Sequence, residues 1–408
     1  MTRDDALQRD KEDPLRHLRD RFEVPDGVIY LDGNSLGPLP VGVRDRMASV
    51  IAEEWGQDLI RSWNVHDWIG LPRRVGDKIA KLVGAPPGSV IAGDSTSVQL
   101  FKLLVSATRL RPGRRVIVTE PTNFPTDSYI AASAARLTGC EVRWCDPSDV
   151  AAALDDDVAV LSLTHVDYRS GRMHDAATLT AAAHDAGALV CWDLCHSAGA
   201  LPVDLAGWDA DLAVGCGYKY LNGGPGAPAF AYVNPRVQDG IDQPLAGWMG
   251  HAEPFALERD YRPAPGIARV QTGTPPVLSM AALDTALDAF DGVSMADLRA
   301  KSLALTGYFI DLVDERLARY GVTTEVPRAQ AVRGSQVCLR HPEAYGVVQA
   351  LISRKVIGDF RYPDLARFGF GPLYLRFVDV WDAVDHAAAV LEHEEWARPE
   401  FASKAAVT

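Results

Sequence analysis

Residues 188–200 read ALVCWDLCHSAGA and residues 211–226 read DLAVGCGYKYLNGGPG, and these two stretches decide the fold. Each contains a short strand-like run that is apolar along its whole length rather than on alternate residues. Such strands are buried on both faces, which is typical of a parallel sheet covered by helices. Asp193 ends the first run, and Lys219 closely follows the second. The sequence therefore predicts an α/β protein with its chemistry at the carboxyl ends of these strands.

Similar runs occur on both sides of the two stretches. VIVT at 116–119, VAVLSLTHV at 158–166 and PAFAYV at 228–233 are short and apolar. Helical patterns at 126–137 and 176–186 lie between them. Strands that alternate with helices in this way indicate parallel strands joined by helical crossovers.

The chain changes character after about residue 285. Long amphipathic helical patterns then flank two strand-like segments, which is typical of an α+β arrangement. The helices are LALTGYFIDLVDERLARY at 303–320 and WDAVDHAAAVLEHEEW at 381–396, and the strand-like segments are QVCLR at 336–340 and LYLRFV at 373–378. We therefore predict a large α/β domain over residues 55–285 and a smaller α+β domain formed by residues 1–54 and 286–408.

The overall composition excludes several classes of protein. The chain has 408 residues and a formal net charge of −13, which opposes binding to nucleic-acid backbones and to anionic membranes. The N-terminal 23 residues are mostly charged, and no apolar run approaches the roughly 20 residues needed to span a bilayer. We expect a cytoplasmic protein with neither nucleic acid nor membrane as a partner.

Cysteine and histidine spacing gives no sign of a metal or a disulfide framework. The six cysteines lack CxxC spacing and mostly lie in apolar stretches, so we expect reduced, buried thiols, Cys195 among them. The ten histidines form no HExxH or comparable ligand pair. The sequence predicts no metal site.

Lys219 and Asp193 suggest a cofactor. Tyr218 and Tyr220 flank Lys219 and could desolvate its amine, and a neutral amine is a nucleophile toward aldehydes. Asp193 ends a buried strand, where a carboxylate needs a cationic partner. Pyridoxal phosphate (PLP) needs a carboxylate that keeps its ring nitrogen protonated and a lysine that binds its aldehyde. The two residues fit these two roles.

The two remaining requirements of PLP are a phosphate cradle and a group that covers the ring. Ser95 is a good N-cap for the amphipathic run STSVQLFKLLVSATRL at 95–110. The backbone N–H groups near Thr96 and Ser97 are then unpaired at a helix start, which attracts an anion. Phe124, in the NFPTD turn after a strand, could stack on the ring.

Several motifs resemble those of the kynureninase family, over about residues 30–390. They are LDGNSLGPLP at 31–40, NFPTD at 123–127, WDLCHSAGALPVDL at 192–205, GCGYKYLNGGPGAPAF at 215–230, GWMGH at 247–251 and RFGFGPLYLRF at 367–377. The most specific element is Tyr218 before Lys219, because the related cysteine desulfurases generally carry His there. The resemblance implies a fold-type I PLP enzyme of the aspartate aminotransferase superfamily, with a large, mostly parallel α/β/α domain and a smaller α+β domain.

The resemblance also implies the residues of the site. The expected cofactor-binding residues are Thr96, Ser97, Phe124, Asp127, Thr164, Asp193, His196, Tyr218 and Lys219, with Trp248 and Thr274 reaching in from the other subunit of a homodimer. The expected substrate-binding residues are Asn34, His66 and Arg367. A guanidinium can hold a carboxylate through two parallel hydrogen bonds, although a domain-interface ion pair is the alternative role for Arg367.

The implied reaction is hydrolysis of L-kynurenine, and possibly of 3-hydroxy-L-kynurenine, at the Cβ–Cγ bond. The products are anthranilate, or 3-hydroxyanthranilate, and L-alanine, which places the enzyme in tryptophan catabolism and the kynurenine pathway to NAD. Lys219 moves the substrate's α-proton, Asp193 maintains the electron sink and Tyr218 protonates the β-carbon in this hypothesis.

Two alternatives stay open. A cysteine desulfurase or selenocysteine lyase shares the fold type but needs a thiolate on a mobile loop. Cys338 is the only cysteine of the C-terminal region, and it lies in strand-like QVCLR. The second alternative is a scaffold without activity, against which the joint retention of Lys219, Asp193, Phe124 and Arg367 argues.

Overall fold

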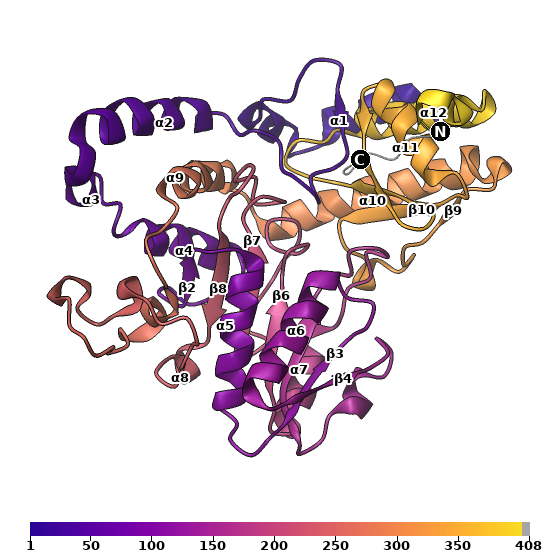
Figure 1. The fold of residues 1–408 in the computed structure, drawn as a ribbon. Coiled ribbons are helices and arrows are strands. Elements are labelled where there is room, and N and C mark those ends of the chain that lie inside the picture. Colours follow the sequence, from indigo (N-terminus) through magenta and orange to yellow (C-terminus); the bar gives the residue numbers. More distant parts are fainter. Residues whose placement is uncertain (402–408) are drawn as a thin grey trace.

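The computed structural model describes residues 1–401, and a seven-stranded sheet lies at its centre (Figure 1). The strand order is β2-β8-β7-β6-β5-β3-β4. The strands are β2 Val90–Ala92, β3 Val116–Thr119, β4 Glu141–Trp144, β5 Val158–Thr164, β6 Leu189–Asp193, β7 Leu212–Cys216 and β8 Ala229–Val233. Only β8 runs against its neighbours. The predicted strands and the mostly parallel sheet are confirmed.

Helices cover both faces of this sheet. All strands except the edge strand β4 are buried along their whole length because each face has its own core. Leu189 and Cys191 of β6 pack with α5 and α6, whereas Val190 and Trp192 pack into the core on the opposite face. The covering helices are α4 Leu71–Leu82, α5 Thr96–Arg109, α6 Pro125–Thr138, α7 Ala176–Asp185 and α9 Val277–Ala286; a short α8 spans Pro235–Gln238. This arrangement confirms the predicted helices between the strands.

The C-terminal part of the chain forms an antiparallel sheet backed by helices. Its strand order is β12-β13-β10-β9. Its elements are α10 Met295–Arg316, β9 Thr323–Thr324, β10 Gln336–Arg340, α11 Ala344–Ser353, β11 Val356–Ile357, β12 Asp359–Arg361, β13 Leu365–Gly369 and α12 Phe377–Glu392. Within residues 1–401 no helix combines the length and the apolar character that crossing a bilayer requires.

One predicted strand of this region is wrong. LYLRFV at 373–378 forms a turn and the first residues of α12, and the strand lies earlier, at Leu365–Gly369. Leu373, Tyr374, Leu375 and Phe377 are all buried. The segment is therefore apolar because it is enclosed by the core, and not because it belongs to a sheet.

The N-terminal segment lies along both parts of the molecule. Helix α1 (Arg3–Glu12) packs on α12, and β1 (Ile29–Tyr30) pairs with β11. The next helix, α2 (Val43–Ser49), packs instead on α9 and continues as a π-helical stretch, Val50–Asp58, and a short α3, Ser62–Val65. Figure 1 shows α2 and α3 extending away from the sheet. The division at residues 54 and 285 stays a prediction.

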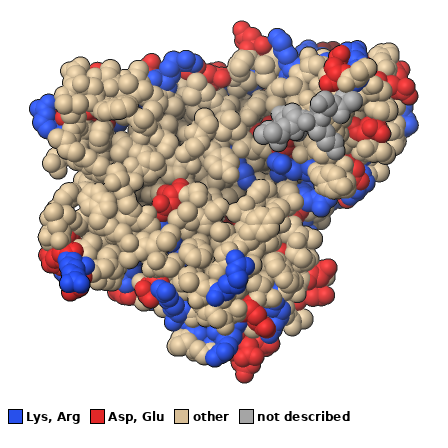
Figure 2. Space-filling view, viewed as in Figure 1, with Lys and Arg blue, Asp and Glu red and all other residues tan. Residues whose placement is uncertain are grey.

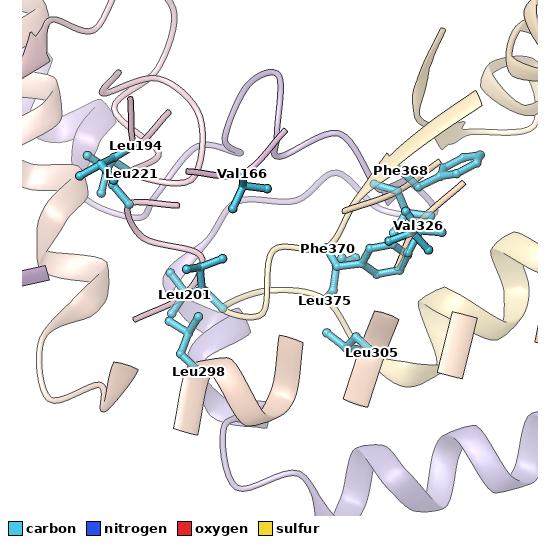
Figure 3. Packing of buried hydrophobic residues seen from close by; sticks show 14 of the residues in the cluster. Val166, Leu194, Leu201, Leu221, Leu298, Leu305, Val326, Phe368, Phe370 and Leu375 are labelled. Atoms are coloured by element: carbon cyan, nitrogen blue, oxygen red, sulfur yellow. The ribbon is translucent and has the colours of Figure 1, made fainter. Parts of the chain in front are cut away.

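A continuous apolar core joins the two parts of the molecule, as Figure 3 shows. Leu194 and Leu221, which follow β6 and β7, belong to the same cluster as Leu298 and Leu305 of α10 and Phe368 of β13. The loops at the carboxyl ends of the large sheet are thus packed against the elements that carry the small sheet. Close packing of this kind fixes side chains from both sheets relative to one another.

The core around β6 predicts a large stability effect. Trp192 is fully buried, and its indole Nε1 donates to Thr180 Oγ1 at 3.1 Å. Trp192→Ala should lower the free energy of unfolding by about 3–5 kcal/mol, as truncation of a buried aromatic side chain does. Urea denaturation of Trp144→Ala, whose side chain is exposed on β4, is the matched control. Equal losses in the two variants would contradict this description of the core.

Candidate active site

A cavity of about 240 Å³ opens at the carboxyl ends of β3, β5, β6 and β7, beside the start of α5 and the β12–β13 hairpin. Eleven of the predicted site residues lie on its wall. They are Asn34, Thr96, Ser97, Phe124, Asp127, Thr164, Asp193, His196, Tyr218, Lys219 and Arg367. Residues that are far apart in the sequence therefore meet where ligands bind in open α/β sheets.

The start of α5 forms one end of the cavity. Ser95 has an extended backbone, and its hydroxyl accepts from the Val98 backbone N–H at 3.4 Å, as the N-cap pattern predicts. Lys102, fully buried in the same helix, bridges the Asp94 carboxylate and the Val270 carbonyl at 2.6 Å each. The turn before the helix is thereby held in place, and Thr96 and Ser97 face the cavity.

Lys219 contacts a histidine from the neighbouring strand end. Its Nζ lies 2.9 Å from Nε2 of His196. Burial, and then the charge of Lys219, lower the pKa of His196 well below its ordinary value. A neutral imidazole accepts a hydrogen bond from the amine at Nε2, which leaves the proton on Nδ1. Nδ1 is buried and has no partner among residues 1–401, so it offers a donor to a bound molecule.

Two carboxyl groups, Asp127 and Asp193, face each other in the cavity. Burial, and then the charge of Asp193, raise the pKa of Asp127 well above its ordinary value. The raised pKa favours the protonated form of Asp127, which can donate a hydrogen bond to Asp193. The backbone N–H of Cys195 also donates to Asp193 Oδ1 at 2.6 Å. These contacts fix the position of the Asp193 carboxyl at the end of β6.

Thr164 and Phe124 complete this side of the cavity. The hydroxyl of Thr164 donates to Asn123 and lies 3.3 Å from Asp127 Oδ2. Asn123 Oδ1 accepts from the Phe124 backbone N–H at 2.7 Å. The half-exposed Phe124 ring packs edge-on against Tyr168, with 5.2 Å between ring centroids. An aromatic face is thus fixed at the mouth of the cavity.

The N-terminal segment reaches the cavity through a close backbone approach. The Gly37 N–H donates to the Tyr218 carbonyl at 2.8 Å, and a Cβ at Gly37 would collide with the carbonyl of Lys219. The approach places Asn34 on the cavity wall. The Asn34 side chain is fully buried, and its amide has no hydrogen-bond partner within the described part of the chain.

Arg367 of β13 is almost fully buried and pairs with Asp359 of β12. Its Nε and Nη2 donate to the two oxygens of Asp359, at 2.8 and 2.5 Å. Burial opposes ionisation of Asp359, but Arg367 and Arg361 outweigh it and lower the pKa of this carboxyl. The ion pair that the sequence left as an alternative thus exists on the wall of the cavity.

Three predicted site residues lie outside this cavity. His66 pairs with Asp58, with 2.9 Å between Nε2 and Oδ2. Trp248 stacks edge-on against Trp63 at a centroid distance of 6.4 Å. Thr274 lies in a segment beside the start of α5. None of the three lines the cavity formed by their own chain.

The cavity also contains residues that the sequence did not predict, namely Ser35, Thr126, Tyr168, Cys195 and Arg361. Cys195, expected to be structural, has its Sγ 3.9 Å from the Thr96 hydroxyl.

The sequence contains a signal that could have placed Arg361 in the site. The segment DFRYPDLARFG at 359–369 contains a Pro-Asp turn between two short runs, which is typical of a hairpin and would set residue 359 opposite residue 367.

The cavity residues fit PLP on physical grounds. The start of α5 supplies unpaired N–H groups for a phosphate. The carboxyl of Asp193 suits a pyridinium, and Lys219 lines the same cavity. The orphaned Nδ1 of His196 supplies a further donor. No group of three or more acidic, Cys or His side chains in residues 1–401 is arranged to hold a metal ion.

The surface carries mixed charge. Figure 2 shows acidic and basic side chains interspersed around the margin of one face, and uncharged residues over most of its middle.

All six cysteines are free thiols, four of them buried.

Solved structures share this architecture. A cysteine desulfurase from Thermococcus onnurineus NA1 has 18% sequence identity and a TM-score of 0.78, and the match covers 92% of this chain and 98% of that chain. The C-DES protein, solved with glycine covalently linked to its PLP cofactor, has 17% identity and a TM-score of 0.77, over 91% and 98% of the two chains. The fold is that of the fold-type I PLP enzymes.

Sequence relatives then give the family. A kynureninase from Pseudomonas fluorescens is 51% identical over 100% of both chains, and one from Burkholderia pseudomallei strain 1106a is 53% identical over the same extent. The family model for the kynureninase C-terminal domain matches residues 298–387. The chain belongs to the kynureninase family.

A buried carboxyl beside the site generates a pH prediction. Burial, and then the charge of Asp359, raise the pKa of Asp32 from 3.8 to about 7. Between these values the folded state holds a proton that the unfolded state has lost, so stability falls as pH rises. The thermal midpoint of Asp32→Asn, relative to wild type, should therefore be higher at about pH 8 than at about pH 5.

Asp26→Asn, at an exposed position of the same segment, is the control and should show no such pH-dependent difference. If the Asp32→Asn difference were the same at both pH values, the raised pKa would be refuted.

Proposed function

We propose that this chain hydrolyses L-kynurenine at the Cβ–Cγ bond, giving anthranilate and L-alanine, with PLP as cofactor. The observation that carries the proposal is the meeting of Lys219, Asp193 and Arg367 in one cavity. The full-length identity of 51–53% to kynureninases supports it. The 3-hydroxylated substrate, with 3-hydroxyanthranilate as product, is a second candidate of the same chemistry.

The family membership implies the cofactor-binding roles, and the position of these residues on the cavity wall supports them. Thr96, Ser97 and Tyr218 would hold the phosphate, Phe124 would cover the ring, and Thr164 and His196 would hold the ring substituents. Asp193 would pair with the ring nitrogen, helped by protonated Asp127. When bound, PLP supplies an electron sink for charge that develops at the substrate's α-carbon.

Two side chains, Lys219 and Tyr218, transfer protons in this proposal. Lys219 takes the α-proton of the substrate. Its Nζ lies 2.9 Å from His196 Nε2, and this neutral acceptor fixes the orientation of the amine. Burial raises the pKa of Tyr218, so the phenol keeps its proton until a strong base forms. Tyr218 is thus able to donate to the β-carbon as alanine forms. Asn34 would bind the substrate through its orphaned amide.

The structure argues against desulfurase chemistry. Cys338 lies in β10, fully buried, and burial raises the pKa of its thiol to about 12. A thiol in this position is neither mobile nor ionised, whereas sulfur transfer needs an accessible thiolate. The cysteine desulfurases share only the fold, at 18% identity.

A homodimer with shared sites explains the residues outside the cavity. Trp248 and Thr274 would reach the phosphate of the partner's site, and His66 would reach the partner's substrate. Trp248, Phe255 and Leu257 are large apolar side chains that are exposed in the single chain, which is typical of a covered interface. The proposal includes a cytoplasmic location and a place in tryptophan catabolism.

The central prediction concerns Lys219. Lys219→Ala should abolish anthranilate formation from L-kynurenine, measured by fluorescence, because the base for the α-proton is lost. Asp193→Ala should lower turnover severely and weaken PLP binding, since the ring nitrogen loses its counter-charge. Lys81→Ala, at an exposed helical position, is the control and should retain activity. Turnover by Asp193→Ala at the wild-type rate would defeat the electron-sink argument.

Subunit complementation tests the shared site. Lys219→Ala and Trp248→Ala should each be inactive or nearly so. Co-expression should restore about a quarter of wild-type activity. The reason is that half of the dimers then contain one subunit of each variant, and each such dimer has one intact site of its two. Size-exclusion chromatography should show a dimer for both single variants and for the co-expressed protein. If co-expression restored nothing, Trp248 would act within its own chain, and if Trp248→Ala alone kept wild-type activity, Trp248 would have no role.

A further inference from the structure

We propose that Arg361 binds the α-carboxylate of the substrate beside Arg367, and that Asp359 is the positioning residue that orients both guanidinium groups. This inference rests on the proposed function and adds a specificity-determining residue to it.

Arg367 has little capacity left for a substrate. A guanidinium has five N–H donors, and four of those of Arg367 are already used. Nε and Nη2 donate to Asp359, Nη2 donates also to Ser35 Oγ at 2.9 Å, and Nη1 donates to the Tyr168 carbonyl at 2.9 Å. One N–H of Nη1 remains. Arg367 alone therefore cannot hold a carboxylate through two parallel hydrogen bonds unless it releases at least one of Asp359, Ser35 and the Tyr168 carbonyl.

Arg361 has the donors that Arg367 lacks. Its Nη2 donates to Asp359 Oδ2 at 2.6 Å and to Ser35 Oγ at 3.4 Å. Its Nε is buried without a partner among residues 1–401, and its side chain lines the cavity. A buried N–H that lacks a partner is costly, so an acceptor from a ligand would stabilise this arrangement.

The hairpin places these groups on one face. In β12, Asp359 and Arg361 are two residues apart and so point to the same side. Arg367 of β13 lies directly opposite Asp359 in the antiparallel pair. Asp359 accepts from both arginines and from Ser35 Oγ, at 2.6 Å. One carboxylate thus spaces two guanidinium groups at the cavity wall.

The net charge of Asp359, Arg361 and Arg367 favours the binding of an anion. Two guanidinium groups face the single carboxylate of Asp359, which leaves an excess positive charge. The nearby Asp32 adds a second negative charge only when it is ionised. An α-carboxylate that enters between Arg361 and Nη1 of Arg367 neutralises the excess, and the charge-assisted hydrogen bonds are among the strong ones in proteins.

A pair of ligands that differ only in the carboxylate tests the proposal. L-Kynurenine carries the carboxylate, and 3-amino-1-(2-aminophenyl)propan-1-one is the same molecule without it. The measurements on the holoenzyme are KM and kcat for kynurenine and the inhibition constant Ki of the amine. Wild type must first form anthranilate, and failure there would overturn the proposed function itself.

For Arg361→Gln we expect KM to rise about ten- to hundred-fold, the loss expected for a charge-assisted hydrogen bond. The Ki of the amine should change less than about two-fold, since the amine has no group for Arg361 to bind. Arg361→Lys, which keeps the charge but not the planar fork, should recover part of the affinity. Asp359→Asn should raise KM in the same selective way because both guanidinium groups lose their orientation.

Arg340→Gln is the matched control, because Arg340 lies on the adjoining strand β10 and pairs with Glu325 and Asp364 outside the cavity. Its KM should match that of wild type. An unchanged KM in Arg361→Gln would overturn the proposal. A parallel rise in the Ki of the amine would overturn it too, since that result indicates a general distortion of the cavity.

Discussion

The buried carboxylate of Asp193 is the constraint on which the rest of the site depends. A charge at the end of a central, buried strand is costly unless it is compensated, and Asp193 is only 6% exposed. The surroundings limit that cost. The Cys195 backbone N–H donates to it, and the raised pKa of Asp127 favours a protonated neighbour over a second charge. In the proposed holoenzyme a cationic ring nitrogen pairs with Asp193 and further offsets the cost of burying this carboxylate. The same carboxylate is thus the counter-charge of the cofactor.

The continuous core explains how this site can include a second sheet. Asp193 ends β6, and Lys219 lies in the loop after β7. The residues that follow the two strands pack through Leu194 and Leu221 into the cluster that contains Phe368 of β13. Arg367 precedes Phe368 and therefore takes a fixed position relative to Lys219. In a family whose substrate is an amino acid, this rigidity orients the carboxylate and the amine of one molecule together.

Much of the large sheet and its site was predictable because the signals are local. Apolar runs that end in polar residues gave β6 and β7, and Ser95 before an amphipathic run gave the N-cap of α5. LYLRFV misled because enclosure by the core and membership of a sheet leave the same apolar pattern. The pairing of Asp359 with Arg367 depends on strand register, and the orphaned donor of Arg361 depends on tertiary packing. The Pro-Asp turn at 363–364 gives a local signal for that register, but no run of neighbouring residues encodes the packing around Arg361.

The central claim is that the amine of Lys219 binds the aldehyde of PLP, and covalent trapping tests it most directly. The purified protein, incubated with PLP, would be reduced with borohydride, digested and mapped by mass spectrometry. The account predicts a pyridoxyl-phosphate adduct on the peptide that carries GYKY at 217–220, and on no other lysine peptide. An unmodified Lys219 peptide, or an adduct confined to another lysine, would contradict it.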